Sequence, residues 1–165
     1  MTSITALAAG SLYDLPMILA PQEIRTYFVS AVTANRRRLF QVETNAQLML
    51  DVLQHYRAQG RFALHAFVIM PDHIHTLITP APDVSLEKAV QFIKGGFSFR
   101  LKSKRDVWER SYNEVQIIVR EKFEACKRYI EENPVKAGLC ASPEEHLYSS
   151  AHRGGGIDPM PEHFR

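Results

Sequence analysis

Two short stretches of the sequence carry residue types that could do chemistry. The first holds His73 and His75, which are separated by a single residue and follow Pro71 and Asp72. On a strand, side chains two positions apart point to the same face, roughly 6.5–7 Å from each other, so the two imidazoles can converge on one metal ion. Taken alone, however, the pair fits better with two polar side chains on the solvated face of a strand.

The second stretch holds Tyr129 and Asn133, four positions apart and directly before Pro134. On a helix, residues at i and i+4 share a face, so a phenol and an amide oxygen can serve the same site. The alternative is a half-buried packing tyrosine followed by an asparagine that ends the helix. Spacing by itself favours this alternative.

The elements that must position these residues are read from hydrophobic periodicity, capping residues and turn residues. The second helix is expected to begin after the Ser85 cap, to stop near Lys94 and to resume after Gly95-Gly96 towards Lys102. The third is expected to end at Asn133, because the residue before a proline resists helical dihedrals. The expected strands are 26–33, 62–70, 73–79 and 115–119, and the expected helices are 43–59, 85–102 and 121–133.

This order, β-α-β-β-α-β-α, predicts the α+β class with a ferredoxin-like, or split βαβ, plan. An antiparallel sheet would carry helices on one face, and one further C-terminal helix would hold Tyr129. The 165 residues fit a single domain, with a core at about 24–151 and irregular ends at 1–20 and 152–165. Neither a membrane span nor a secretory signal is evident, so we expect a cytoplasmic protein with two reduced cysteines, Cys126 and Cys140.

The net charge is only +2, but basic residues are concentrated in two segments. Residues 94–128 hold ten Lys and Arg against five Asp and Glu, and Arg36, Arg37 and Arg38 form a second cluster. Such clusters bind phosphates, although a basic helix face is often only solvated. Both interpretations stay open at the level of composition.

Longer stretches around both motifs resemble a known family. The segment 67–75, FVIMPDHIH, resembles the HUH motif (His, bulky hydrophobic, His) of the single-tyrosine transposases. The segment 129–139, YIEENPVKAGL, is similar to the nucleophile helix of one branch of them, the REP-associated tyrosine transposases. Supporting matches lie at 27–40, 94–98, 107–112 and 148–151, so the resemblance extends over about 27–151 in the order and spacing of that family.

The resemblance implies a metal-dependent endonuclease and strand transferase acting on single-stranded DNA near palindromic hairpin repeats. Tyr129 would be the nucleophile, forming a 5′-phosphotyrosine, while His73, His75 and Asn133 would hold a divalent metal ion, Mg²⁺ or Mn²⁺. The enzyme would be a monomer or homodimer. The residues expected to contact DNA are Arg36, Arg37, Arg38, Lys94, Arg100, Lys102, Trp108 and Tyr112. For the aromatic residues among them, packing in the core is an equally good interpretation.

The sequence also departs from the family. Val115 follows Glu114 where relatives often carry a histidine or basic residue, and the stretch between Leu101 and Trp108 is short. His65 is expected to face solvent, with a place near the metal as the alternative. Two other functions stay open: a ferredoxin-like module that binds single-stranded nucleic-acid hairpins without cutting them, and a hydrolase that uses a metal-bound water.

Overall fold

The computed structural model describes residues 23–152 and 156–165. The irregular N-terminal end expected at 1–20 lies outside these residues. Four antiparallel strands form one sheet in the order β2-β3-β1-β4. Their bounds are Thr26–Val32 for β1, Phe62–Met70 for β2, His73–Pro80 for β3 and Asn113–Ile117 for β4. This is the predicted ferredoxin-like α+β plan.

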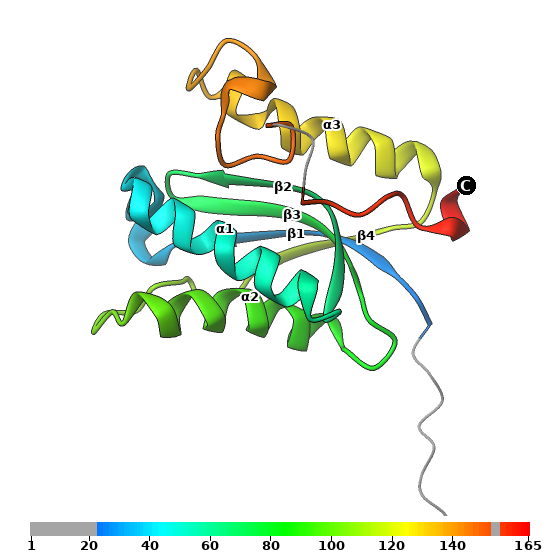
Figure 1. Cartoon of the computed structure of the whole chain (residues 1–165), viewed down its shortest axis with the longest axis horizontal. Helices are drawn as coiled ribbons and strands as arrows, with labels where there is room; N and C mark the ends of the chain where they lie inside the picture. Colours follow the sequence, from blue (N-terminus) through cyan, green and yellow to red (C-terminus); the bar gives the residue numbers. More distant parts are fainter. Residues whose placement is uncertain (1–22, 153–155) are drawn as a thin grey trace, which may run out of the picture.

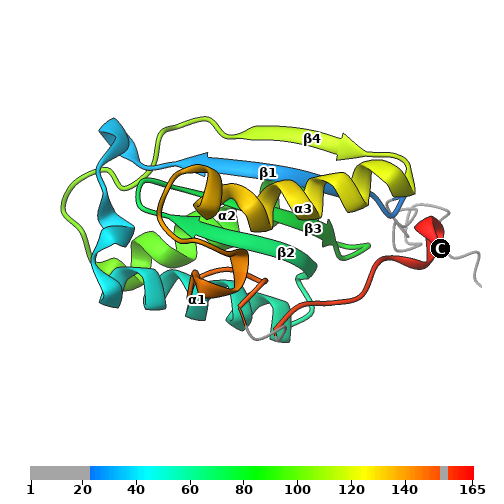
Figure 2. The same ribbon diagram turned by 90° about the horizontal axis from the view of Figure 1, so that it is seen from above.

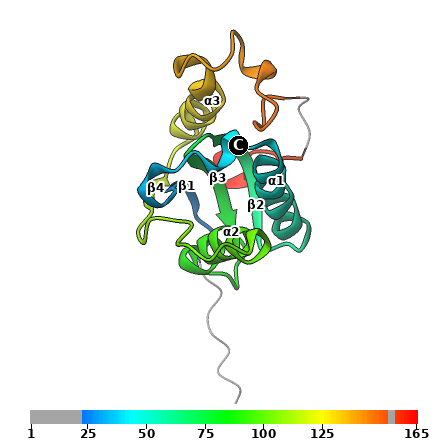
Figure 3. The same cartoon turned by 90° about the vertical axis from the view of Figure 1, so that its left-hand side faces the viewer.

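The helices lie on both faces of the sheet (Figure 1, Figure 3). Helices α1 (Glu43–Ala58) and α2 (Leu86–Leu101) cover one face, and α3 (Arg120–Lys136) crosses the other. Each face has its own hydrophobic core. Because side chains alternate along a strand, Ile74 enters the α1/α2 core while its neighbours His73 and His75 point towards α3.

Helix α2 is continuous, so the predicted interruption at Gly95-Gly96 is wrong. A Cβ on Gly96 would lie 2.7 Å from Cε2 of Tyr56 and 3.1 Å from Cγ1 of Val52, both on α1. Gly96 therefore permits the close approach of two helices and does not break one. The predicted cap is confirmed, since Ser85 Oγ accepts a hydrogen bond from the Lys88 backbone N–H at 3.1 Å.

Helix α3 runs through Pro134, so the predicted end at Asn133 is also wrong. Pro134 is buried against the sheet, and its packing compensates for the backbone hydrogen bond that proline cannot donate. The Ala137 N–H donates to the Asn133 carbonyl at 3.0 Å, which continues the helix past the proline. Strand β4 begins and ends two residues earlier than predicted, because Val119 becomes the N-cap of α3.

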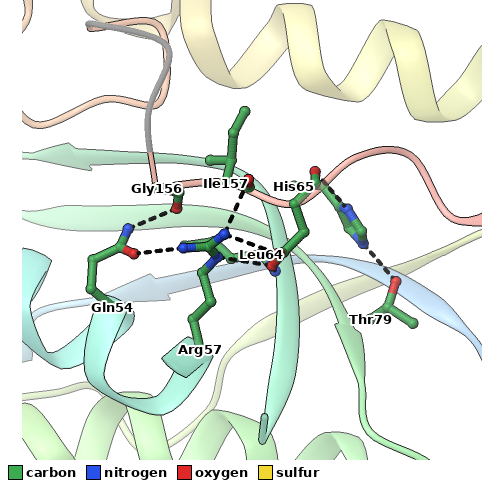
Figure 4. Close-up of polar contacts among 8 residues, drawn as sticks. Gln54, Arg57, Leu64, His65, Thr79, Gly156 and Ile157 are labelled. Atoms are coloured by element: carbon green, nitrogen blue, oxygen red, sulfur yellow. Dashed lines mark hydrogen bonds and ion pairs between the residues drawn. The ribbon is translucent and has the colours of Figure 1, made fainter. Parts of the chain in front are cut away.

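The described part of the C-terminal segment has little regular structure and lies along the outer edge of β2. The Ser150 N–H donates to the Phe67 carbonyl at 2.9 Å, and the Asp158 N–H donates to the Leu64 carbonyl at 2.7 Å. The side chain of Asp158 also pairs with Arg57 of α1 at 2.9 Å, within a network that joins the segment to α1 and β2 (Figure 4). This segment covers part of an otherwise exposed strand edge.

Phe164, near the C-terminus, is buried against Phe123 of α3 with ring centroids 5.6 Å apart. The C-terminal segment therefore links α1, β2 and the first half of α3. Within the described residues, none of the helices is both long and apolar enough to cross a bilayer.

Candidate active site

The two histidines of the first motif lie at the start of β3, on the face that α3 crosses. Their ring centroids are 4.7 Å apart. His75 is buried and its ring stacks on Phe28 of β1 at 5.3 Å, while His73 is partly exposed at the strand end. The alternative of two solvated polar residues is therefore wrong for His75.

A neighbouring side chain holds the Nδ1 atom of each ring. His73 Nδ1 lies 2.7 Å from Asp72 Oδ1, and His75 Nδ1 lies 2.6 Å from Ser30 Oγ on the adjacent strand. Neither Nε2 atom takes part in a hydrogen bond with any residue that the structure describes. When the proton sits on Nδ1, the lone pair of Nε2 is free to bind a metal ion, which is the usual arrangement of metal-binding histidines.

The protonation states agree with this arrangement. Burial, with a smaller contribution from the charge of His73, lowers the pKa of His75 to about 4, so its ring is neutral at neutral pH. Burial alone would raise the pKa of Asp72, but hydrogen bonds from His73 and Arg36 outweigh it and hold that pKa below its ordinary value. Asp72 is thus a carboxylate that accepts the Nδ1–H of His73.

Helix α3 lies over the sheet (Figure 2). It brings Tyr129 to the histidines. The Tyr129 ring centroid lies 5.8 Å from that of His75, and the ring meets Phe28 edge-on at 5.9 Å. Nearly half of its surface, 46%, stays exposed, so a large substrate can reach the phenol. Lys136, two turns further along α3, places its Nζ 5.8 Å from the Tyr129 ring centroid.

Asn133 lies one helical turn after Tyr129 and is partly buried. Because α3 continues through Pro134, the predicted i, i+4 relation between the two residues is kept. No cluster of three or more His, Cys, Asp and Glu side chains with the geometry to hold a metal exists among the described residues. Two imidazoles and an amide oxygen would leave coordination positions open, as expected for Mg²⁺ or Mn²⁺, and two imidazoles would also accept Zn²⁺ or Ni²⁺.

The basic residues predicted to contact DNA lie in two places. Arg36 contacts Asp72 at 3.4 Å, Arg37 donates to the Asp106 carbonyl, and Arg38 is exposed beside them. Of these three, Arg36 is linked to His73 through Asp72. Arg100 and Lys102 are exposed at the C-terminal end of α2.

Lys94, Trp108 and Tyr112, which were also predicted to contact DNA, interact with other residues of the protein. The Trp108 indole N–H donates to the Lys94 carbonyl at 3.0 Å, and its ring packs on Phe40 and Phe97. Lys94 Nζ donates to the Glu109 carbonyl at 2.8 Å and lies 5.8 Å from the Tyr112 ring centroid. Burial lowers the pKa of Lys94. Trp108 is thus chiefly a packing residue, and DNA contacts by these side chains stay predictions.

His65 neither faces solvent nor approaches the other histidines, so both of its sequence interpretations are wrong. It is 2% exposed, with Nε2 2.8 Å from Thr79 Oγ1 and the ring against Phe123. It lies at an irregularity in the pairing of β2 with β3, where the register shifts between Leu64 and Ala66. Such a bulge turns a side chain to an unexpected face.

Sequence reasoning missed Ser30, Phe28 and Lys136. Ser30 is directly opposite His75 in the register of β1 with β3, and that register cannot be read from either segment alone. Lys136 could have been found from its spacing, because it lies seven residues after Tyr129 and shares its helical face. It was missed because the helix was predicted to end at Asn133.

Comparisons with known proteins show the family and the fold. Over residues 24–133 the chain matches the family model "Transposase IS200 like". It is similar to the solved structure of a REP-associated tyrosine transposase bound to a REP hairpin, with 22% identity, a TM-score of 0.71 and coverage of 92% of this chain and 94% of that one. A solved structure from Deinococcus radiodurans R1 aligns at 21% identity with a TM-score of 0.49, over 72% of this chain and 97% of that one. Among curated proteins none matches. Because the family model matches two thirds of the sequence, this chain belongs to the IS200-like transposase family.

Proposed function

We propose that this transposase-family protein is a metal-dependent endonuclease and strand transferase that cuts single-stranded DNA beside hairpins through Tyr129. The observation that carries the proposal is the position of the exposed Tyr129 ring, 5.8 Å from that of His75. The similar solved structure contains a REP-associated transposase bound to a REP hairpin, and we extend a hairpin substrate to this chain on that basis.

His73, His75 and Asn133 would hold the divalent ion. Asp72 and Ser30 hold the two imidazoles in place at their Nδ1 atoms, and the Asp72 carboxylate also favours the Nδ1–H form of His73. The bound ion supplies positive charge that offsets the charge on the non-bridging oxygens of the scissile phosphate. Phe28 stacks on His75 and shields one side of the site from water.

Tyr129 would attack a phosphorus atom in line with the bond to the 3′ oxygen. Its phenolic oxygen would lose its proton and form a bond to phosphorus while the bond to the 3′ oxygen breaks, and the released 3′ oxygen would take up a proton to become a hydroxyl. The resulting 5′-phosphotyrosine conserves the bond energy, so a second 3′-hydroxyl can reverse the step and join two strands without ATP. Lys136 adds a cation beside the phenol, where the phosphate must lie.

All these groups come from one chain, so we propose that a monomer suffices for cleavage. A test incubates the protein with Mn²⁺ and a single-stranded oligonucleotide that contains a hairpin, and follows a covalent adduct on a denaturing gel. The wild type should form the adduct, and Tyr129→Phe should not, while it retains binding. His73→Ala should lose cleavage as well.

The outcomes separate the alternatives. An adduct formed by Tyr129→Phe would show that another residue is the nucleophile. Cleavage by Tyr129→Phe without an adduct would favour hydrolysis by a metal-bound water. Hairpin binding by the wild type with no cleavage under any metal would favour a module that only binds.

A further inference from the structure

An open pocket of about 860 Å³ lies beside the candidate active site, at the end of the sheet. One wall is the segment that follows β1, and the other is the segment between α2 and β4; both are at the left of Figure 2. The walls are joined by backbone, since the Ala34 N–H donates to the Val107 carbonyl at 2.9 Å and the Asn35 N–H donates to Glu109 Oε1 at 3.0 Å. The pocket is therefore a built feature of the fold.

The charged residues that line this pocket are mostly cations. It includes four cations, Arg37, Lys104, Arg105 and Arg110, against two carboxylates, Asp106 and Glu109. The Glu109 carboxylate already accepts a hydrogen bond from the Asn35 backbone. Among the residues that the structure describes, Lys104, Arg105 and Arg110 form no ion pair.

The charge distinguishes this pocket from the other hollows on the surface. A pocket beside α2 is lined by three glutamates, Glu23, Glu87 and Glu114, and by one cation, Arg25. A pocket beside α3 is lined by three glutamates and by two cations, Lys127 and Arg128. Unpaired cations around a concave surface attract phosphate groups. A volume of this size also holds an unpaired nucleotide, and Trp108 supplies an aromatic edge in the wall.

Hydrogen bonds and an ion pair link one wall of the pocket to the segment that carries the histidines. Arg36 follows Asn35 of the pocket wall and contacts Asp72, whose carboxylate accepts from His73. The Thr33 N–H also donates to the Asp72 carbonyl at 3.0 Å, which fixes this wall to the start of β3. A single-stranded DNA whose scissile phosphate lies at the histidines would therefore have its neighbouring nucleotides at the pocket.

We infer that this pocket binds the unpaired nucleotides that flank the scissile phosphate, through Lys104, Arg105 and Arg110 on the backbone. The inference rests on the proposed function, because it takes single-stranded DNA as the substrate. The unpaired nucleotides bind in the pocket, and the hairpin binds to other surfaces of the protein.

The test measures binding, so it does not depend on cleavage. In a Tyr129→Phe background without metal, fluorescence anisotropy compares a hairpin that carries a single-stranded flank with the same hairpin lacking it. Lys104→Ala/Arg110→Ala should weaken binding of the flanked hairpin about tenfold and reduce its salt dependence by about two counterions, with about twofold or less effect on the bare hairpin.

A matched control removes the same charge elsewhere. Arg120→Ala/Lys122→Ala alters exposed cations at the start of α3 and should leave the preference for the flank unchanged. In the wild type, the flanked oligonucleotide should also protect Lys104 from acetylation, a readout that needs no variant.

Equal losses for both hairpins, equal losses in the control variant, or an unprotected Lys104 would each overturn the inference. Failure of the proposed function would show differently, as absence of the adduct in the wild type with flank binding intact.

Discussion

The carboxylate of Asp72 accepts the Nδ1–H of His73 across 2.7 Å, and its other oxygen contacts Arg36 at 3.4 Å. One side chain thus links the basic segment after β1 to the first histidine of the motif. Ser30 serves His75 in the same way from the neighbouring strand. Both imidazoles are therefore held before any metal or substrate arrives, which reduces the cost of ordering them on binding.

The first prediction concerns these two partners. Asp72→Ala and Ser30→Ala should each weaken Mn²⁺ affinity about 10-fold to 100-fold, because an unsupported ring rotates and its tautomer is no longer fixed. Asp72→Asn should recover part of the loss, since an amide oxygen can still accept from Nδ1–H. Titration of free Mn²⁺ by electron paramagnetic resonance, without DNA, measures the affinity. Asp83→Asn, in an exposed loop, is the control, and unchanged affinity in both alanine variants would contradict the prediction.

The second prediction concerns Lys136, whose Nζ lies over the Tyr129 ring and also pairs with Glu132 at 3.6 Å. Lys136→Met should lower the single-turnover cleavage rate about tenfold at saturating DNA. This is less than the loss typical of a buried electrostatic group, because Lys136 is solvent-exposed. Lys136→Arg should retain most of the rate. If DNA affinity falls in Lys136→Met while the rate at saturation does not, Lys136 only binds substrate.

The third prediction is a pH dependence of stability. Burial lowers the pKa of His65 below its ordinary value of 6.5, a shift to which Lys127 adds and which the Asp158 carbonyl and charge oppose. At pH values between the pKa of His65 in the folded protein and its pKa in the unfolded chain, the unfolded chain binds more protons. The contribution of His65 to stability is therefore complete above about pH 6.5 and is lost as the pH falls below that value. Urea unfolding at about pH 7.5 and about pH 5.5 measures the change.

His65→Gln should show a smaller drop between those two pH values than the wild type, because it removes the group whose protonation the fold opposes. His55→Gln, on the exposed end of α1, provides the comparison and should keep the wild-type drop. A drop of equal size in all three proteins would show that His65 is not responsible.

Local patterns predicted most of the elements closely. The ends of α1, β2 and β3 differ from expectation by a residue or none, because their hydrophobic patterns and the turn at Pro71-Asp72 are signals local to these segments. The errors lie where packing overrides local preference. Gly96 and Pro134 look like helix breakers, yet both lie inside helices because a neighbouring helix or the sheet compensates locally.

The sequence by itself determined the residue types of the candidate site and their spacing within each motif. His73 and His75 share a face because strand periodicity is two, and Tyr129 and Asn133 share one because helix periodicity is about 3.6. Only the tertiary structure decided that the two motifs meet, with α3 laid over the face that presents the histidines (Figure 3). The partnership of Ser30 with His75 and the cationic pocket depend on strand register and on loops distant in sequence, and only packing of the whole chain fixes those.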